Sequence, residues 1–274
     1  MVVGRSVLHR YAAAGGALLA GGLTYSALFA LLPALLLLTA VLGLVVEDPI
    51  RRAAILDSLG RAVPPLRDFL EASMDELAAR ASAYGVIGVV GLAWGASRFY
   101  ASLDDAFARV FSGPPRRGFV ARTVRGVVSV AAILSGFLIA LALTSVLSFL
   151  LEQARNGLGS TPLDARGLLS PALAAAVLVV GTLAVYRIVP ARHVTWSAAI
   201  PPALIVGTLV AGLTQAFSFV APRLIGSAAL FGAFVAVFAA MIWMSLVFQL
   251  LLIGAAWVRE RLGPPVPSVP PAKG

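Results

Sequence analysis

Six long intervals of this chain contain no charged residue, and their length constrains the fold more than any other feature. They cover residues 11–46, 81–97, 126–151, 167–186, 194–222 and 224–258. An apolar, uncharged stretch of about 18 or more residues can cross a bilayer as a helix. Five intervals reach that length, and the second extends past Arg98, because the aliphatic stem of an arginine lets its charge reach the interface. The sequence therefore predicts an all-α polytopic membrane protein with six transmembrane helices.

Composition agrees with a chain that lies almost entirely in a bilayer. Of the 274 residues, 60% are apolar and 12% are charged. In soluble domains about one half of the residues are apolar and about one quarter are charged. The apolar runs are continuous rather than alternating, which favours helices over a barrel. We expect one transmembrane domain over residues 1–262 and a proline-rich, disordered tail over residues 263–274.

Residues that carry common enzyme chemistry are scarce. The chain has no cysteine, its two histidines lack metal-ligand spacing, and the six intervals contain no Asp or Glu. No Walker, HExxH or GxSxG motif is present. We therefore expect no enzyme activity, no metal and no cofactor. The net charge of +9 fits basic loops that set topology and contact anionic membrane lipids, so no nucleic-acid partner is expected.

Basic residues are divided unevenly between the two predicted sides of the membrane. With six helices both termini share a side, which carries 13 of the Lys and Arg residues, against 8 on the other side. Basic loops stay in the cytoplasm, so both termini are expected there. The loop 47–80 then lies outside and is predicted to contain an amphipathic helix. This helix is either a cap packed over the bundle or a lid over an access path.

Prolines and glycines mark places where helices are expected to bend or pack closely. Pro33 in the first helix and Pro201-Pro202 in the fifth remove backbone donors and predict a kink or break. Such a break is either structural or the gating break of a transporter helix. Gly91 and Gly95 form a GxxxG step, which predicts close helix packing, with dimerisation as the alternative.

Two arginines at the predicted cytoplasmic boundary are the candidate ligand-binding residues. Arg98 and Arg187 each follow a charge-free interval, where a charge is either a functional group or an interfacial anchor. Asp104 and Asp105 are the expected carboxylate partners, either of Arg98 along its helix or of Arg187 across the bundle. A guanidinium fork suits phosphate, so these residues predict a site for an anionic headgroup.

Four segments, in this order and spacing, resemble the YihY/BrkB family of bacterial inner-membrane proteins. They are YSALFALLP (25–33), WGASR (94–98), YRIVP (186–190) with Val194 and Trp196, and FG (231–232) with Trp243 and LLIGA (251–255). The resemblance implies a six-helix inner-membrane protein with a sizeable outside loop after the first helix. Export of an envelope lipid has been suspected for such proteins. The chain departs from the family at Ala256, where an acidic residue is frequent, and at Pro201-Pro202, where a Gly-Ala-like step is expected.

Two classes of function follow. The first is a transporter or flippase-like handler of an anionic envelope lipid or lipid-linked precursor, supported by the resemblance, the kinkable helices, the amphipathic outside loop and the boundary arginines. A lateral gap between helices lined by arginine would favour it. The alternative is a non-transporting structural or partner-organising membrane protein, in which the glycine-rich second helix contacts a second copy of the chain or an envelope protein. A closed bundle with an apolar groove at Gly91 and Gly95 favours that alternative. A small-ion pore would need a polar lining that the intervals lack.

Overall fold

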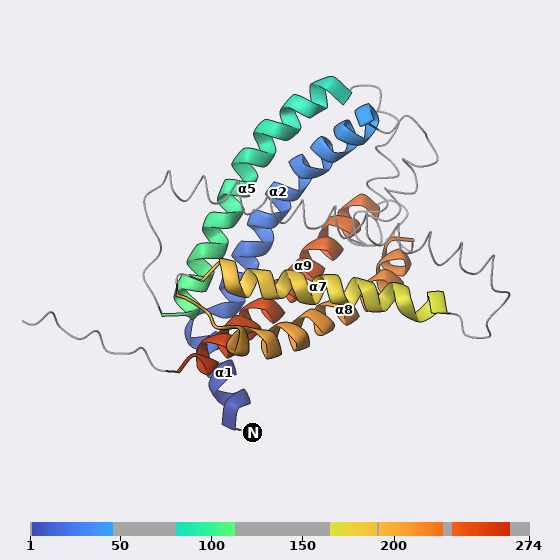
Figure 1. Ribbon diagram of the computed structural model, residues 1–274. Helices are drawn as coiled ribbons and strands as arrows, with labels where there is room; N and C mark the ends of the chain where they lie inside the picture. The colour runs from blue at the N-terminus through green and yellow to red at the C-terminus, as the bar shows by residue number, and fades with distance from the viewer. Residues whose placement is uncertain (1, 46–80, 113–164, 191, 227–231, 264–274) are drawn as a thin grey trace, which may run out of the picture.

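The computed structural model describes residues 2–45, 81–112, 165–190, 192–226 and 232–263. Within these ranges the chain forms helices and no strand (Figure 1). The helices are α1 (Val2–Ala13), α2 (Gly16–Val45), α5 (Ala81–Val110), α7 (Ala165–Ile188), α8 (Trp196–Gly226) and α9 (Gly232–Arg261). The predicted all-α class is confirmed for the described residues. The predicted span 126–151, the loop 47–80 and the tail from residue 264 lie outside them.

Two of the helices are long and apolar enough to cross a membrane. The qualifying stretches are Trp196–Val220 of α8 and Val237–Arg261 of α9. A third span exists if α1 and α2, which are bent by 63° relative to one another, belong to a single crossing. A shorter apolar stretch, Ala174–Ile188, lies in α7. The chain is therefore a helical membrane protein, whereas the count of six spans stays a prediction.

The first predicted span, 11–46, is divided in the structure. Helix α1 ends at Ala13 and α2 begins at Gly16. Between them Gly15 has a φ of 71°, a left-handed conformation that glycine adopts without a steric penalty. Gly16 lies against the ring of Tyr11, and a side chain at this position would overlap that ring. Hydropathy alone did not reveal the turn, because all the residues around it are uncharged.

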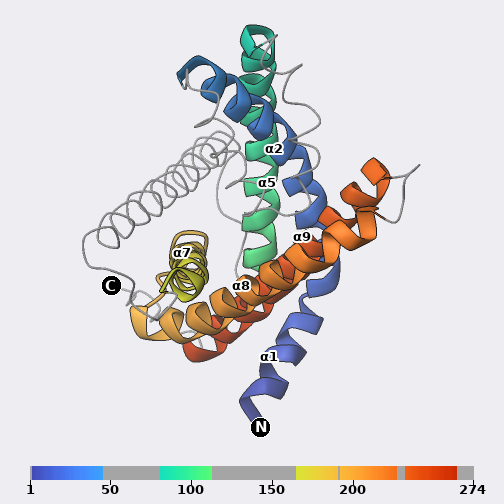
Figure 2. The same ribbon diagram turned by 90° about the vertical axis from the view of Figure 1, so that its right-hand side faces the viewer.

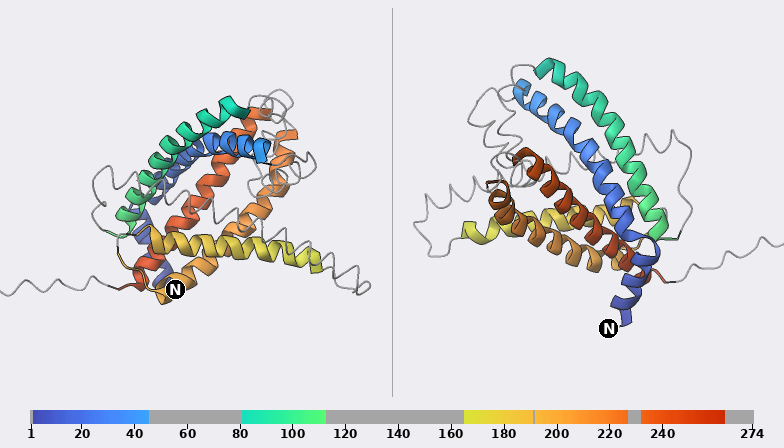
Figure 3. Two further views of the ribbon diagram at one scale, coloured as in Figure 1. Left: turned by 45° about the horizontal axis from the view of Figure 1, so that its top comes forward. Right: turned by 180° about the vertical axis from the view of Figure 1, so that it is seen from behind.

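The described helices converge at one end of the molecule, which we call the shared end (Figures 1 and 3). Helices α5, α7 and α9 finish there, and α2 and α8 begin there. The buried core lies at this end and includes Leu23, Phe107, Tyr186, Val194, Leu252 and Val258. Helices α8 and α9 run side by side away from it, and α1 extends beyond it (Figure 2). Helix α1 and the last turn of α9 thus lie on one side, as expected if both termini share a side.

Candidate functional site

The predicted kink and the predicted glycine face meet in a single seam between α2 and α5. A Cβ atom at Gly91 would lie 2.9 Å from the ring of Pro33. A Cβ atom at Gly95 would lie 2.8 Å from the Cα of Ala30 and 2.9 Å from the carbonyl oxygen of Phe29. These distances leave no room for a side chain, so the glycines allow the two backbones to approach closely. The GxxxG face therefore contacts another helix of the same chain.

Neither predicted proline break interrupts its helix. Helix α2 is continuous through Pro33, and α8 is continuous through Pro201 and Pro202. Pro201 has no N–H to donate to the carbonyl oxygen of Ser197, four residues earlier. Arg261, at the end of α9, donates to that oxygen instead, over 3.2 Å. Arg261 thus satisfies the carbonyl oxygen that Pro201 leaves without its helical donor.

Arg187 holds the connection between α7 and α8. Its Nη1 donates to the carbonyl oxygen of Val194 over 3.0 Å, and its guanidinium carbon lies 4.0 Å from the centroid of the Trp196 ring. A guanidinium over an indole face gains a cation–π attraction. The geometry therefore gives Arg187 a structural role in this turn.

Arg98 and Arg187, which the sequence predicts to share a site, lie at different positions along the bundle. Arg98 is exposed on α5, whereas Asp104 is buried and Asp105 is half-buried further along the same helix. The last turn of α7 meets α5 at Phe107, whose ring lies 6.4 Å from that of Tyr186. Phe107 follows Arg98 by nine residues, a helical rise of about 14 Å. The two arginines are therefore offset along the bundle.

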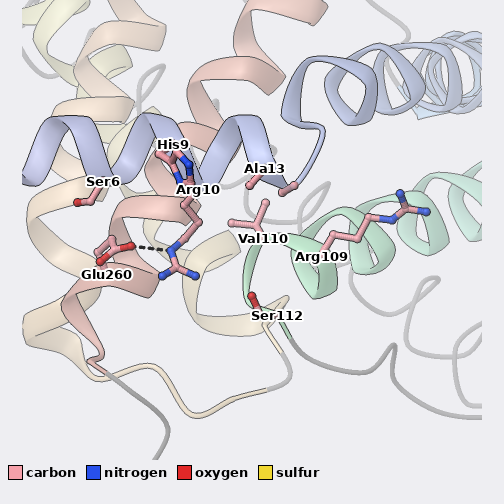
Figure 4. A pocket seen from close by; sticks show the side chains of 9 residues that line it. Ser6, His9, Arg10, Ala13, Arg109, Val110, Ser112 and Glu260 are labelled. Carbon is pink, nitrogen blue, oxygen red and sulfur yellow. Dashed lines mark hydrogen bonds and ion pairs between the residues drawn. The ribbon is translucent and has the colours of Figure 1, made fainter.

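A polar pocket, which we call the basic pocket, lies where α1, α5 and α9 meet at the shared end (Figure 4). Its volume is about 350 Å³. It is lined by Ser6, His9, Arg10, Ala13, Ala14, Arg109, Val110, Ser112 and Glu260. Figure 4 shows the Arg10 side chain turned toward Glu260, and the Nε atom of Arg10 lies 2.6 Å from Oε1 of Glu260. Glu260 is the one acid in this lining, against two arginines and a histidine.

A buried arginine lies beside this pocket. Arg259 is only 7% exposed. Its Nε donates to the carbonyl oxygen of Phe111 over 3.3 Å and its Nη1 to that of Gly263 over 2.6 Å. These oxygens lie just beyond the C-terminal ends of α5 and α9, where backbone carbonyls lack helical partners and the helix dipoles favour a cation. Arg259 thus joins two helix ends and adds positive charge next to the pocket.

The sequence did not predict the basic pocket, because its residues come from three distant segments. Arg10 and Glu260 are 250 residues apart, and the charges at span ends read as topology determinants. One signal was present: Glu260 is the only acid after Asp164, and it stands between two arginines. Among the described residues no group of three or more His, Cys, Asp or Glu side chains could hold a metal ion.

The segments that carry the family resemblance pair with one another in the fold. Residues 25–33 and 94–98 form the α2–α5 seam, where the rings of Phe29 and Trp94 lie 6.5 Å apart. Residues 186–190 contact residues 251–255, where the hydroxyl of the buried Tyr186 donates a hydrogen bond to the carbonyl oxygen of Leu251 over 3.0 Å. Gly254 leaves the space that this hydroxyl occupies. These segments therefore build the helix contacts of the fold.

Comparisons with known proteins cover nearly the whole chain. The family described as Virulence factor BrkB matches residues 7–263. A UPF0761 membrane protein of Rhodospirillum rubrum is 27% identical over 247 residues, which cover 88% of this chain and 54% of the relative. The chain thus spans about half the length of that curated relative. No solved structure matches.

Proposed function

The chain belongs to the virulence factor BrkB family of membrane proteins, and from this premise we propose that it binds and moves an anionic envelope lipid or lipid-linked precursor, as a transporter or flippase does. The basic pocket at the shared end carries the proposal. Its lining brings Arg10 and Ser112 together at the end of apolar helices and includes Arg109, whose guanidinium is directed away from the Arg10–Glu260 pair (Figure 4). The ligand would be an amphiphile, with its charge at the pocket and its chains in the bilayer.

The dimensions and chemistry of the pocket suit a headgroup. A volume of about 350 Å³ is at the lower end of the range for small-molecule sites, so a phosphate-bearing headgroup fits and a whole lipid does not. Guanidinium and hydroxyl groups donate hydrogen bonds to phosphate oxygens. Leu18, Tyr25 and Trp94 are exposed on α2 and α5 and offer apolar surface for acyl or isoprenoid chains.

Location and chemistry follow the same proposal. In this proposal the termini and the basic pocket lie at the cytoplasmic leaflet of the bacterial inner membrane, because the side predicted to carry them has more basic residues. Arginines near anionic headgroups are favourable there. The protein would bind and move its ligand without a catalytic step or a cofactor.

Lipid retained during purification tests the binding part of the proposal. Anionic lipid per folded protein, measured by mass spectrometry, is expected to fall several-fold in Arg10→Gln and Arg109→Gln. Arg223→Gln is the matched control, because Arg223 is exposed in the last turn of α8 and does not line the pocket. Equal lipid content in all four proteins would remove the pocket as the lipid site.

Reconstitution tests movement separately from binding. In proteoliposomes with a fluorescent phosphatidylglycerol, we expect the parent to transfer the probe between leaflets and Arg109→Gln to do so more slowly. Binding without transfer would support a non-transporting role. The dimer form of that alternative has lost its main support, because Gly91 and Gly95 contact α2 within the chain.

A further inference from the structure

We propose that Glu260 is an internal anion, which occupies Arg10 in the basic pocket until a phosphate group of the ligand replaces it. The inference rests on the proposed function and concerns the regulation of the same site. It arises from the contrast between a pocket rich in cations and the one carboxylate that lines it.

The geometry of the contact between Arg10 and Glu260 allows a phosphate group to replace the carboxylate. It joins one nitrogen to one oxygen, Nε to Oε1, at 2.6 Å. The two side chains are 30% and 27% exposed, so water and a ligand reach them, and exposed ion pairs contribute little to stability. A phosphate group forms two parallel hydrogen bonds with a guanidinium and carries up to two negative charges. It therefore competes favourably with this single carboxylate contact.

The surrounding charges stabilise both states of the exchange. With Glu260 in place, its carboxylate offsets part of the positive charge of Arg10 and of Arg259, which lie close enough to interact electrostatically. After exchange, phosphate takes over at Arg10, in a pocket whose lining also includes Arg109. The released carboxylate remains beside Arg259, its neighbour in sequence. Neither state leaves the carboxylate isolated from a cation.

The exchange also couples ligand binding to helix α1. The Arg10–Glu260 ion pair connects α1 to α9, and α1 is attached to α2 through the turn at Gly15 and Gly16. Replacing Glu260 by a ligand removes this link and leaves α1 held by its apolar contacts, such as that of Val7 in the core. Ligand occupancy would thus change how firmly α1 is held against α9.

Binding titrations in neutral detergent test the exchange. The probes are dioctanoyl phosphatidic acid and inorganic phosphate, and the proteins are the parent, Glu260→Gln, Arg10→Gln and Arg5→Gln. Removing the internal competitor in Glu260→Gln is expected to tighten phosphatidic acid binding about three- to fivefold. Arg10→Gln should weaken it about tenfold. Arg5→Gln should match the parent, because Arg5 is exposed on α1 outside the pocket lining.

The two probes identify the source of the phosphate. Equal tightening for both supports exchange by phosphate alone, and tightening for phosphatidic acid alone supports exchange that needs the lipid chain. Glu260→Asp provides a second variant, because it keeps the charge but shortens the side chain by one methylene, so an intermediate tightening is expected.

Two outcomes overturn different claims. Unchanged or weaker binding in both Glu260 variants, together with weaker binding in Arg10→Gln, would reject the internal anion and keep the pocket as the ligand site. Binding of neither probe to any of these proteins would reject the pocket and, with it, the proposed function.

Discussion

Arginines in the described helices serve two different purposes. Arg187, Arg259 and Arg261 donate to backbone carbonyl oxygens near helix ends. Arg10 and Arg109 line the basic pocket. The division follows from helix chemistry, since the last carbonyls of a helix have no partner within it and a long cationic side chain can reach them. Of these five arginines, Arg10 and Arg109 are the two that line a pocket for a ligand, which a count of basic residues cannot show.

Arg259 should matter more to stability than Arg261. Arg259→Gln is expected to lower the free energy of unfolding by about 2 kcal/mol, because two charge-assisted hydrogen bonds are lost at a buried position. Arg261→Gln removes one bond at an exposed position and should cost less than about 1 kcal/mol. Unfolding in detergent, followed by circular dichroism, measures both. Equal losses of unfolding free energy in the two variants would show that the two carbonyl contacts of Arg259 stabilise the protein no more than the one contact of Arg261.

Arg187 and Trp196 should be energetically coupled. A double-mutant cycle with Arg187→Gln and Trp196→Leu is expected to give a coupling energy of about 0.5–1 kcal/mol, the size of an exposed cation–π contact. Arg187→Gln should also retain as much lipid as the parent. Purely additive losses of stability would contradict the coupling between Arg187 and Trp196. A loss of lipid at equal folded yield would instead support the ligand site that the sequence predicts for Arg187.

Among the elements, the α2–α5 seam shows how small residues decide packing. Gly88 also belongs to it, since a Cβ atom there would lie 2.8 Å from the backbone nitrogen of Leu37. Ser26 and Ser102 add a hydrogen bond across the seam, at 2.9 Å between their hydroxyl oxygens. Three glycines and one polar pair therefore hold these helices at close range. In a bilayer such packing replaces the hydrophobic effect as the force that joins helices.

Adding one methyl group should have opposite effects at two glycines. Gly95→Ala is expected to destabilise the protein by about 1–3 kcal/mol, because its Cβ would meet backbone atoms of α2 that cannot give way. Gly212→Ala in α8 meets nothing within 4 Å and should keep or raise the melting temperature, since alanine favours helix. Melting temperatures in detergent compare the two. A Gly95→Ala protein as stable as the parent would contradict the close approach of the α2 and α5 backbones at Gly95.

The elements were predictable from the sequence to the extent that hydropathy reports them. Long uncharged runs predicted the helices that became α2, α5, α7, α8 and α9, because apolar length is what a bilayer selects. The turn at Gly15 was missed, because it depends on a backbone angle and on the ring of Tyr11 rather than on polarity. At Pro201 the sequence predicted a break or a bend; α8 is continuous there, and the Arg261 donor at the freed carbonyl could not be predicted because it comes from another helix.

The candidate site was less predictable than the elements. A pocket requires side chains that are near in space, and Arg10, Arg109 and Glu260 are near only after α1, α5 and α9 have converged. Arg98 and Arg187 were chosen because each ends an apolar interval. That pattern marks the end of an apolar run but gives neither the position of each arginine along the bundle nor the residue that it faces.

For the whole molecule, the main feature is the concentration of polar contacts at the shared end. The Arg10–Glu260 ion pair, the Arg259 contacts and the Arg187–Trp196 stack all lie where helices begin or finish. Helix ends require polar partners, and a bilayer supplies them only at its surface. The shared end is thus the part of the described structure suited to the membrane–water boundary.

Cysteine accessibility tests this placement and its orientation together. The chain has no native cysteine, so single substitutions give unambiguous labelling. Ala13→Cys and Ser112→Cys both lie exposed at the basic pocket and should react alike with an impermeant thiol reagent. We expect neither to be labelled in intact cells whose outer barrier is permeabilised, and both to be labelled after lysis. Ser58→Cys, in the loop predicted to lie outside, should be labelled before lysis.

Different labelling of Ala13→Cys and Ser112→Cys would contradict the convergence of α1 and α5. Labelling of both before lysis, with Ser58→Cys protected, would keep the fold and invert it in the membrane, because the small excess of basic residues would then have failed to set the topology.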